Sequence, residues 1–369
     1  MFKSPSVDLQ AHVAQSTTTT IPPETDQATG QPQYTGLTQI MSDLLGIMPT
    51  TNSGFTSAFA GQKNEKANEH QNEIEIENGK QKFYFMPVAD WSLLASMAIE
   101  NTDRMARGKP CKPLVVVDEE MAHMLREKGP LLMAREIESL YRTKPELCPD
   151  LFRNLPELVR VACLQEQLRE VLPVIFQDLT HAAGPLGSAT HVEIPAHGGA
   201  GSSDLEFHPW QGDDKKIKFS VDEIAELLAM SGIPRNAELK ISSCESAVGK
   251  PASALSPAAL REAIRGDRGE QSFCEQLGGL LSQRIDHQGP ITGYGADLSA
   301  GHSRHVLEVA TPGEPHARQA EYAADKARIT FRPNEQPALY ESPAALAEVL
   351  QRKRDKRQMQ FDQAQSRST

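Results

Sequence analysis

Short apolar runs alternate with helical segments between residues 81 and 330, and this alternation constrains the fold more than any other feature of the chain. The runs PLVVVD (113–118) and VLPVIFQ (171–177) are rich in β-branched residues, which is typical of strands buried on both faces. The helical patterns that follow or separate such runs cover 119–127, 130–143 and 155–170. Strands that alternate with helices build βαβ units, so we expect an α/β domain with a mainly parallel sheet.

The two ends of the chain differ from this central domain. Residues 1–80 are rich in Ser, Thr, Gln, Pro, Asn and Glu, so we expect a disordered region, with the short amphipathic segment 36–48 as a candidate docking helix. Residues 331–369 are expected to form a helical or disordered tail with a basic cluster, QRKRDKRQ (351–358). That cluster is either a solvated face or a site for an anionic partner.

Composition excludes several classes of protein. The net charge of −11 argues against general nucleic-acid binding, which depends on basic groups at the phosphates. The chain contains no run of about 18 apolar residues, so no membrane span is expected. Its five cysteines are widely spaced and include no C-x-x-C pair, which favours free thiols in a reducing compartment over disulfides or a metal site.

Two strand-like runs end in residues that can carry chemistry. HVEIPAH (191–197) ends at His197, and AELKISSC (237–244) ends at Cys244, with a helix predicted between them by the capping box of Ser220 and Glu223. Because neighbouring parallel strands bring their carboxyl ends to one edge of a sheet, the imidazole and the thiol can lie side by side there. This pattern favours a Cys nucleophile with a His general base.

Neighbouring residues fit the same interpretation. Gly198 follows the histidine, and without a Cβ its backbone N–H can approach a developing oxyanion; the Cys244 N–H is the second donor. His208 is expected to line the site and His191 to pack, and Trp210 is a candidate for a wall of a substrate pocket. The remaining cysteines are interpreted as core thiols, which is also the alternative for Cys244.

The ordered pair of motifs, PAHGG (195–199) and ISSCES (241–246), resembles the clan CD cysteine peptidases. This group includes caspases, legumains, clostripain, separases, CHAT domains and the self-processing cysteine protease domains of bacterial toxins. The spacing of 47 residues between His197 and Cys244 is closest to the toxin and CHAT members. The resemblance implies a three-layer caspase–hemoglobinase-like domain over residues 81–330.

In function, the resemblance implies a Cys/His dyad that cleaves a host protein or the chain itself. Toxin members add an Asp that orients the His, for which Asp178 and Asp118 are the candidates here, and an inositol hexakisphosphate activator from the host cell. Basic residues considered for such a polyanion are Lys215, Lys216 and Lys218, or the cluster 351–358.

The N-terminal composition is also similar to the export signals of bacterial type III secretion systems. It predicts a secreted virulence effector that acts in the host cytosol; the alternative location is the cytoplasm. Two alternative functions stay open, namely an inactive caspase-like scaffold that binds a peptide, and another thiol enzyme such as an acyltransferase or a deamidase.

Overall fold

The computed structural model describes residues 81–143, 153, 155–180, 184–208, 216–267, 269–300, 307–311, 314–319 and 323–368. Four sequence predictions lie outside these residues: the disordered region 1–80, the core thiol Cys148, the candidate pocket wall at Trp210 and the polyanion contact at Lys215. The described residues belong to one compact unit, Gly36–Thr369.

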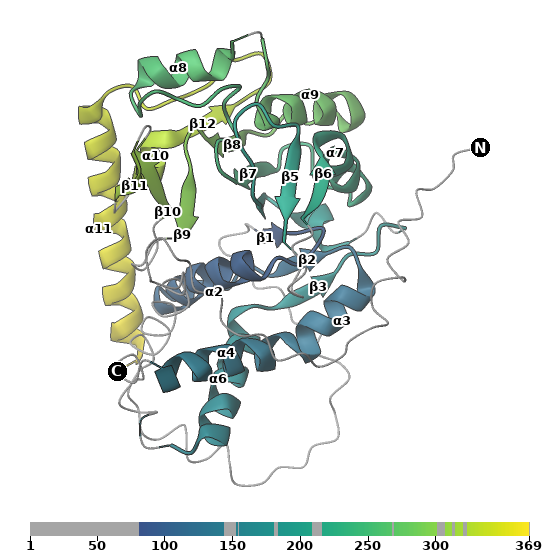
Figure 1. Ribbon diagram of the computed structural model, residues 1–369, viewed down its shortest axis with the longest axis vertical. Coiled ribbons are helices and arrows are strands. Elements are labelled where there is room, and N and C mark those ends of the chain that lie inside the picture. The colour runs from purple at the N-terminus through teal and green to yellow at the C-terminus, as the bar shows by residue number, and fades with distance from the viewer. Residues whose placement is uncertain are drawn as a thin grey trace, which may run out of the picture. The chain divides into compact units, whose positions relative to one another are not determined.

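A seven-stranded sheet forms the centre of the domain, with the strand order β12-β8-β7-β4-β1-β2-β3 (Figure 1). Every pair from β8 to β3 is parallel, and only β12 runs antiparallel to its neighbour β8. The predicted α/β class with a mainly parallel sheet is therefore confirmed. The strands are β1 (Lys82–Phe85), β2 (Leu114–Val116), β3 (Val174–Phe176), β4 (His191–Pro195), β7 (Glu238–Ser242), β8 (Ile291–Tyr294) and β12 (Arg328–Phe331).

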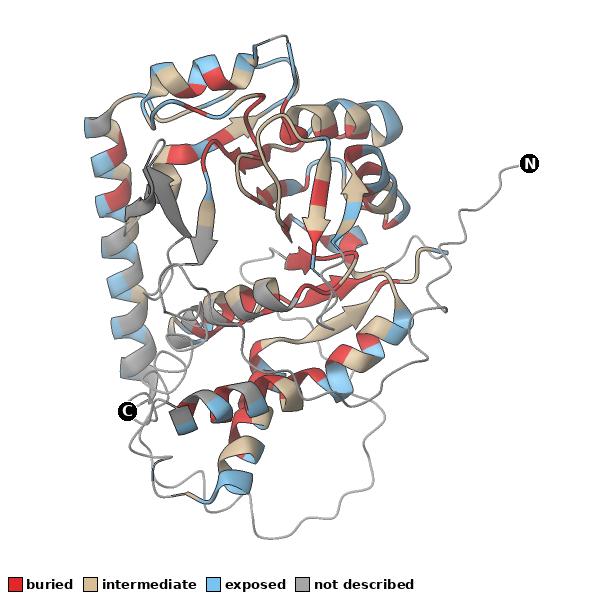
Figure 2. Ribbon diagram, viewed as in Figure 1, coloured by how far each residue is buried: buried red, intermediate tan, exposed pale blue. Residues whose placement is uncertain are grey.

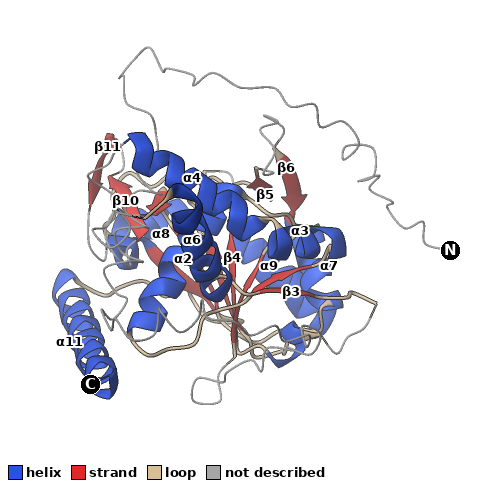
Figure 3. Cartoon of the chain, turned by 90° about the horizontal axis from the view of Figure 1, so that it is seen from below, coloured by secondary structure: helices blue, strands red, loops and turns tan. Residues whose placement is uncertain are grey.

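Helices connect the strands and cover both faces of the sheet (Figure 3). Most of them follow the sequence prediction to within a few residues, including the helix that Ser220 and Glu223 cap with the predicted reciprocal hydrogen bonds. The helices are α2 (Trp91–Ala106), α3 (Glu119–Glu127), α4 (Gly129–Thr143), α6 (Glu157–Val171), α7 (Val221–Met230), α8 (Pro257–Arg265), α9 (Phe273–Ile285), α10 (Ala323–Ala327) and α11 (Pro343–Ser368), with a 3-10 turn at Pro185–Ser188.

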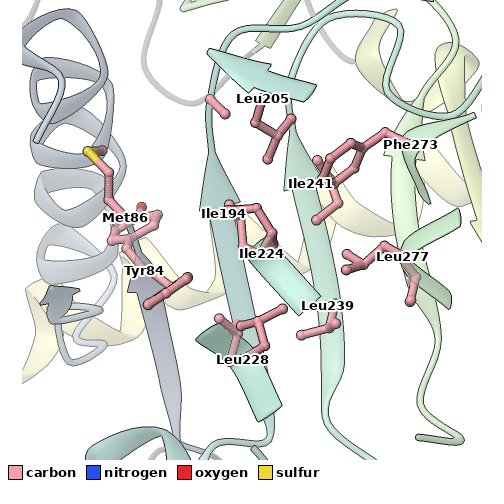
Figure 4. Packing of buried hydrophobic residues seen from close by; sticks show 14 of the residues in the cluster. Tyr84, Met86, Ile194, Leu205, Ile224, Leu228, Leu239, Ile241, Phe273 and Leu277 are labelled. Carbon is pink, nitrogen blue, oxygen red and sulfur yellow. The ribbon is translucent and has the colours of Figure 1, made fainter. Parts of the chain in front are cut away.

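One face of the two central strands forms the apolar core against α7 and α9. Ile194 of β4 and Ile241 of β7 are fully buried on this face, with Ile224 of α7 and Leu277 of α9 (Figure 4). Alternate residues of a strand point to opposite faces, so this packing fixes which residues of β4 and β7 face the other way. Each such side chain contributes about 1.5–3 kcal/mol when it is buried. Buried residues lie on the strands of the main sheet and on one side of the helices that cover it (Figure 2).

The opposite face carries a buried ionic cluster. Tyr84, Glu193 and Lys240 are register neighbours across β1, β4 and β7. Lys112 reaches the carboxylates of both Glu193 and Glu100, the latter from α2, and its Nζ lies 4.8 Å from the centre of the Tyr84 ring. This polar face, covered by α2, is the one that continues towards His197 and Cys244.

Two smaller sheets flank the main one. The hairpin of β5 (Asp204–Phe207) and β6 (Ile217–Ser220) follows the histidine loop. The strand β10 (Leu307–Thr311) pairs antiparallel with β9 (Leu298–Ala300) and β11 (Glu314–Gln319) and does not join the main sheet. Its alternating sequence, LEVAT, suits an antiparallel sheet with one solvated face better than a doubly covered parallel one.

The C-terminal tail contains a helix. Leu346 and Leu350 of α11 are buried, and the ammonium of Lys353 pairs with the Asp325 carboxylate of α10 at 2.6 Å. The basic cluster 351–358 therefore lies on a helix, one of the two forms predicted for this tail. None of the helices that the structure describes is long and apolar enough to cross a membrane.

Candidate active site

His197 lies two residues beyond the end of β4, and its backbone is fixed on both sides. Its N–H donates to the carbonyl of Glu206, and its carbonyl accepts from the Glu206 N–H, both at 2.9 Å. These two bonds attach the histidine to β5. The His197 side chain is 38% exposed, so it is held at the sheet edge and remains open to a ligand.

Cys244 lies at the corresponding place beyond β7. Pro195 of β4 and Ser242 of β7 are register partners, and the N–H of Ala196 donates to the Ser242 carbonyl at 3.3 Å. His197 and Cys244 each follow their register partner by two residues, and adjacent strands are about 4.8 Å apart. The structure therefore brings the predicted imidazole and thiol to the same edge of the sheet.

Asp90 is the acidic residue that the structure places against the histidine. Its side chain is fully buried, and its Oδ2 lies 3.3 Å from the Nε2 of His197. Asp90 directly precedes α2, where its Oδ1 accepts from the N–H of Leu93 as an N-cap. The parallel pairing of β1 with β4 brings it to this edge. Sequence reasoning missed it, although an Asp between a strand and a helix start was the available signal.

The two acidic residues singled out from the sequence have other partners. Asp178 follows β3, and β1 and β2 separate β3 from β4, which corresponds to roughly 14 Å at the usual strand spacing. Its Oδ1 accepts from the backbone and hydroxyl of Thr180. Asp118 caps α3 by accepting from the N–H of Met121 at 2.6 Å. Asp90 therefore replaces Asp178 as the residue beside His197.

Gly198 allows the histidine and cysteine loops to approach each other. A Cβ at this position would lie 2.5 Å from the Oγ of Ser243 and 3.6 Å from the carbonyl oxygen of Cys244. At the first distance either the Ser243 hydroxyl or a loop has to shift to accommodate a Cβ, so the close approach favours glycine. Within the described part of the chain, the Gly198 N–H makes no hydrogen bond, which is compatible with the predicted role as an oxyanion donor.

The thiol of Cys244 lies against the backbone of β9. The N–H of Leu298 donates to Sγ at 3.3 Å, and the thiol donates to the Leu298 carbonyl at 3.5 Å. Burial raises the pKa of the Cys244 thiol, and the nearby carboxylates of Asp297 and Glu245 act in the same direction. The thiol in this state is protonated near neutral pH.

The residue after the cysteine has a strained backbone. Glu245 has a φ of +48°, a conformation that side chains other than glycine rarely adopt. Its Oε2 accepts from the N–H of Ala200 at 3.2 Å, and its own N–H donates to the carbonyl of Ala296. The turn after Cys244 is thus attached to the histidine loop on one side and to the chain before β9 on the other.

The carboxylate of Glu193, on β4 before its carboxyl end, joins β4 to β7. Oε1 of Glu193 accepts from Nζ of Lys240 and from Oγ of Ser242, both at 2.5 Å, while its Oε2 lies 2.7 Å from Nζ of Lys112. Burial acts to raise the pKa of Glu193, but the ammonium groups of Lys112 and Lys240 outweigh it and hold the pKa well below its usual range. These bonds fix the relative position of the two strands that carry His197 and Cys244.

The structure also shows the partners of two lysines and one histidine that the sequence analysis named. Lys216 and Lys218 both pair with the Glu206 carboxylate, at 3.1 and 2.8 Å, so these two candidate polyanion residues already neutralise an acidic side chain. His191 lies 3.4 Å from Glu238, at the opposite end of β4 from His197. Among the described residues, no group of His, Cys, Asp and Glu side chains is arranged to hold a metal ion.

The remaining cysteines in the described ranges are free thiols, as predicted. Cys163 and Cys274 are buried and Cys111 is half-buried. Burial raises the pKa of Cys111 to about 11 and that of Cys274 to about 12. Cys148 lies outside the described residues. Of the described thiols, Cys244 is the one placed at the carboxyl edge of the sheet.

Comparisons with known proteins give no relative on which to rest a function. No family model matches the chain, and neither a curated protein nor a solved structure is significantly similar to it.

Proposed function

We propose that this chain is a cysteine endopeptidase with a caspase-like architecture, in which Cys244 is the nucleophile and His197 the general base and acid. One observation carries the proposal. His197, whose imidazole contacts the buried Asp90 carboxylate, and Cys244 occupy equivalent positions beyond two adjacent parallel strands. A nucleophile, a base and a group that orients the base are the parts that a thiol peptidase requires.

In the proposed reaction, His197 takes the proton of the Cys244 thiol as Sγ attacks the carbonyl carbon of the scissile peptide bond. The developing oxyanion accepts hydrogen bonds from the backbone N–H groups of Gly198 and Cys244. The C–N bond then breaks, and His197 gives its proton to the leaving amine. Water, deprotonated by His197, hydrolyses the thioester, which releases the acid and restores the thiol.

The environment of the thiol decides between two ways to generate the nucleophile. Burial and the carboxylates of Glu245 and Asp297 favour the protonated thiol of Cys244 over a preformed thiolate. The proton therefore moves to His197 during the attack, and Asp90 stabilises the imidazolium that forms. Since the thiol is bonded to Leu298 in this state, substrate has to displace that contact.

The proposal is tested with purified wild type, Cys244→Ala, His197→Ala and Asp90→Asn. Each protein is incubated with and without host-cell extract and inositol hexakisphosphate, and the products are analysed on gels and by intact mass. Fragments of the chain or of an extract protein that appear with wild type and not with Cys244→Ala or His197→Ala support a peptidase and locate its cleavage site. Uncut proteins in all samples contradict it and favour the peptide-binding scaffold.

The same samples test the other thiol chemistries. With Asp90 beside His197, the site contains the Cys, His and Asp that an acyltransferase or deamidase also uses. An acylated or deamidated extract protein without chain cleavage favours that alternative. Delivery from a bacterium into a host cell rests on the composition of residues 1–80 and is part of the proposal only to that extent.

A further inference from the structure

His208 lies beside the proposed general base without being part of the Cys/His pair. It directly follows β5, and its ring is close to the His197 ring, with centroids 4.6 Å apart and planes inclined by 55°. The residue itself is exposed. The two imidazoles therefore pack in a tilted contact at the open side of the site.

The backbone of His208 reaches the same carboxylate as the His197 side chain. The N–H of His208 donates to Oδ2 of Asp90 at 2.6 Å, and this oxygen also lies 3.3 Å from Nε2 of His197. A fully buried carboxylate is thus fixed from two sides, by its own helix start and by His208. This arrangement orients the oxygen that His197 contacts.

The backbone hydrogen bonds of β5 place His208 beside His197 and Asp90. Glu206 pairs with the backbone of His197 in both directions, and Phe207 is fully buried. The charged neighbours of the pair from the surrounding elements are Asp90 at the start of α2 and Glu206, whose carboxylate is neutralised by two lysines. The contact between the His197 and His208 rings is therefore a packing contact, which depends on the shape of the His208 ring and on the position that β5 gives it.

We propose that His208 is a positioning residue, whose ring packs against His197 and whose backbone N–H fixes Asp90, so that the His197 imidazole stays directed at its partners. This inference rests on the proposed role of His197 as the base for Cys244. A rotation of the His197 ring away from Asp90 would cost activity because small misplacements of a catalytic group cost up to ~100-fold in rate.

Substitutions at residue 208 separate ring packing from ring chemistry. His208→Ala removes the ring and keeps the backbone N–H, whereas His208→Phe keeps an aromatic ring that cannot carry a proton. His191→Ala is the matched control, because His191 lies at the far end of the same strand and pairs with Glu238. Thermal unfolding of each variant is measured to check that the domain remains folded.

The measurement is the rate at which iodoacetamide alkylates Cys244 in the full-length chain, followed by mass spectrometry of the cysteine peptide over a range of pH. This readout needs no knowledge of the substrate. We expect His197→Ala to slow alkylation near neutral pH by ~10-fold or more, His208→Ala by ~3- to 10-fold, and His208→Phe by less than ~2-fold. His191→Ala should match wild type.

Two results would overturn the inference while leaving the proposed function intact. One is an unchanged rate and pH profile for His208→Ala while His197→Ala is slow. The other is a loss in His208→Phe equal to that in His208→Ala, which would mean that the imidazole of His208 transfers protons. If His197→Ala itself reacts at the wild-type rate, the proposed function fails first, and the inference fails with it.

Discussion

The thiol of Cys244 and the backbone of Leu298 bond to each other in both directions, with N–H···Sγ at 3.3 Å and Sγ···O at 3.5 Å. This contact places the proposed nucleophile against a strand of the smaller sheet. Because burial raises its pKa, the fraction present as thiolate near neutral pH is smaller than for an exposed cysteine. The described form thus corresponds to a resting state of the proposed enzyme.

This contact predicts the pH dependence of the reaction of Cys244 with an alkylating reagent. Since the thiolate is the reactive species and its pKa is raised, the midpoint of the increase in alkylation rate with pH should lie above ~8.5, the pKa of an ordinary cysteine. The measurement is the rate of modification of the Cys244 peptide, with a short unfolded peptide of the same sequence as the control. A rate that levels off at or below the pH of the control peptide would contradict the covered, protonated thiol.

Asp90→Asn is expected to lower Cys244-dependent activity by ~10²- to 10⁴-fold with little change in fold, because the neutral amide cannot stabilise the imidazolium of His197. The buried amide still fits the site and still accepts the backbone bond of His208. Asp178→Asn is the matched control, since Asp178 follows the edge strand β3 and bonds to Thr180 there. This variant should retain wild-type activity. Equal activity of the two variants would remove Asp90 from the site.

The contrast between Asp90 and Asp178 shows which part of the site could be predicted from sequence. Both follow a strand, and a linear pattern gives no reason to prefer one. The strand order decides, because β1 is next to β4 whereas β3 is two strands further away. Strand order depends on the packing of the whole domain, which short motifs do not encode.

His197 and Cys244 were predictable for the opposite reason. Each belongs to an apolar run whose strand character is local, and β4 and β7 are neighbours in the sheet, joined by the β5–β6 hairpin and the helix α7. The contact of Leu298 with the thiol was not predictable, because it joins residues 54 positions apart and because β9 belongs to a separate antiparallel sheet. Local sequence patterns were therefore sufficient to locate His197 and Cys244. Their neighbours Asp90 and Leu298 depend on contacts between distant parts of the chain.

The ionic cluster beneath the site predicts a strong effect of Glu193→Gln on stability. This change leaves Lys112 and Lys240 without their buried carboxylate, and breaking such a pair costs about 3–5 kcal/mol. The pKa of Glu193 is lowered in the folded state, so its contribution is complete above the unfolded value of ~4.3 and is lost as the pH falls through the lower folded value.

Urea unfolding of wild type and Glu193→Gln over a range of pH tests both parts of this prediction. The free energy of unfolding of wild type should decrease below the ordinary pKa of glutamate more steeply than that of the variant. Glu238→Gln is a suitable comparison, because Glu238 lies on β7 but is exposed and pairs with His191 at the opposite end of β4 from His197. A stability of Glu193→Gln within ~0.5 kcal/mol of wild type would show that the cluster does not hold the strands together.

The close approach of the two loops gives a prediction that one variant pair can decide. Gly198→Ala places a Cβ 2.5 Å from the Oγ of Ser243, so the buried hydroxyl or one loop has to shift, and both stability and Cys244-dependent activity should fall. In Gly198→Ala/Ser243→Ala the conflicting oxygen is gone, and the nearest atoms, the Ser243 Cβ and the Cys244 carbonyl oxygen, lie at ordinary contact distances of 3.7 and 3.6 Å. We therefore expect the double variant to recover much of both properties, which is a positive coupling in a double-mutant cycle.

Gly199→Ala is the control, since nothing lies within 4 Å of its added Cβ. If Gly198→Ala behaves like Gly199→Ala, the two loops do not meet as described, and His197 and Cys244 are not held together by this contact.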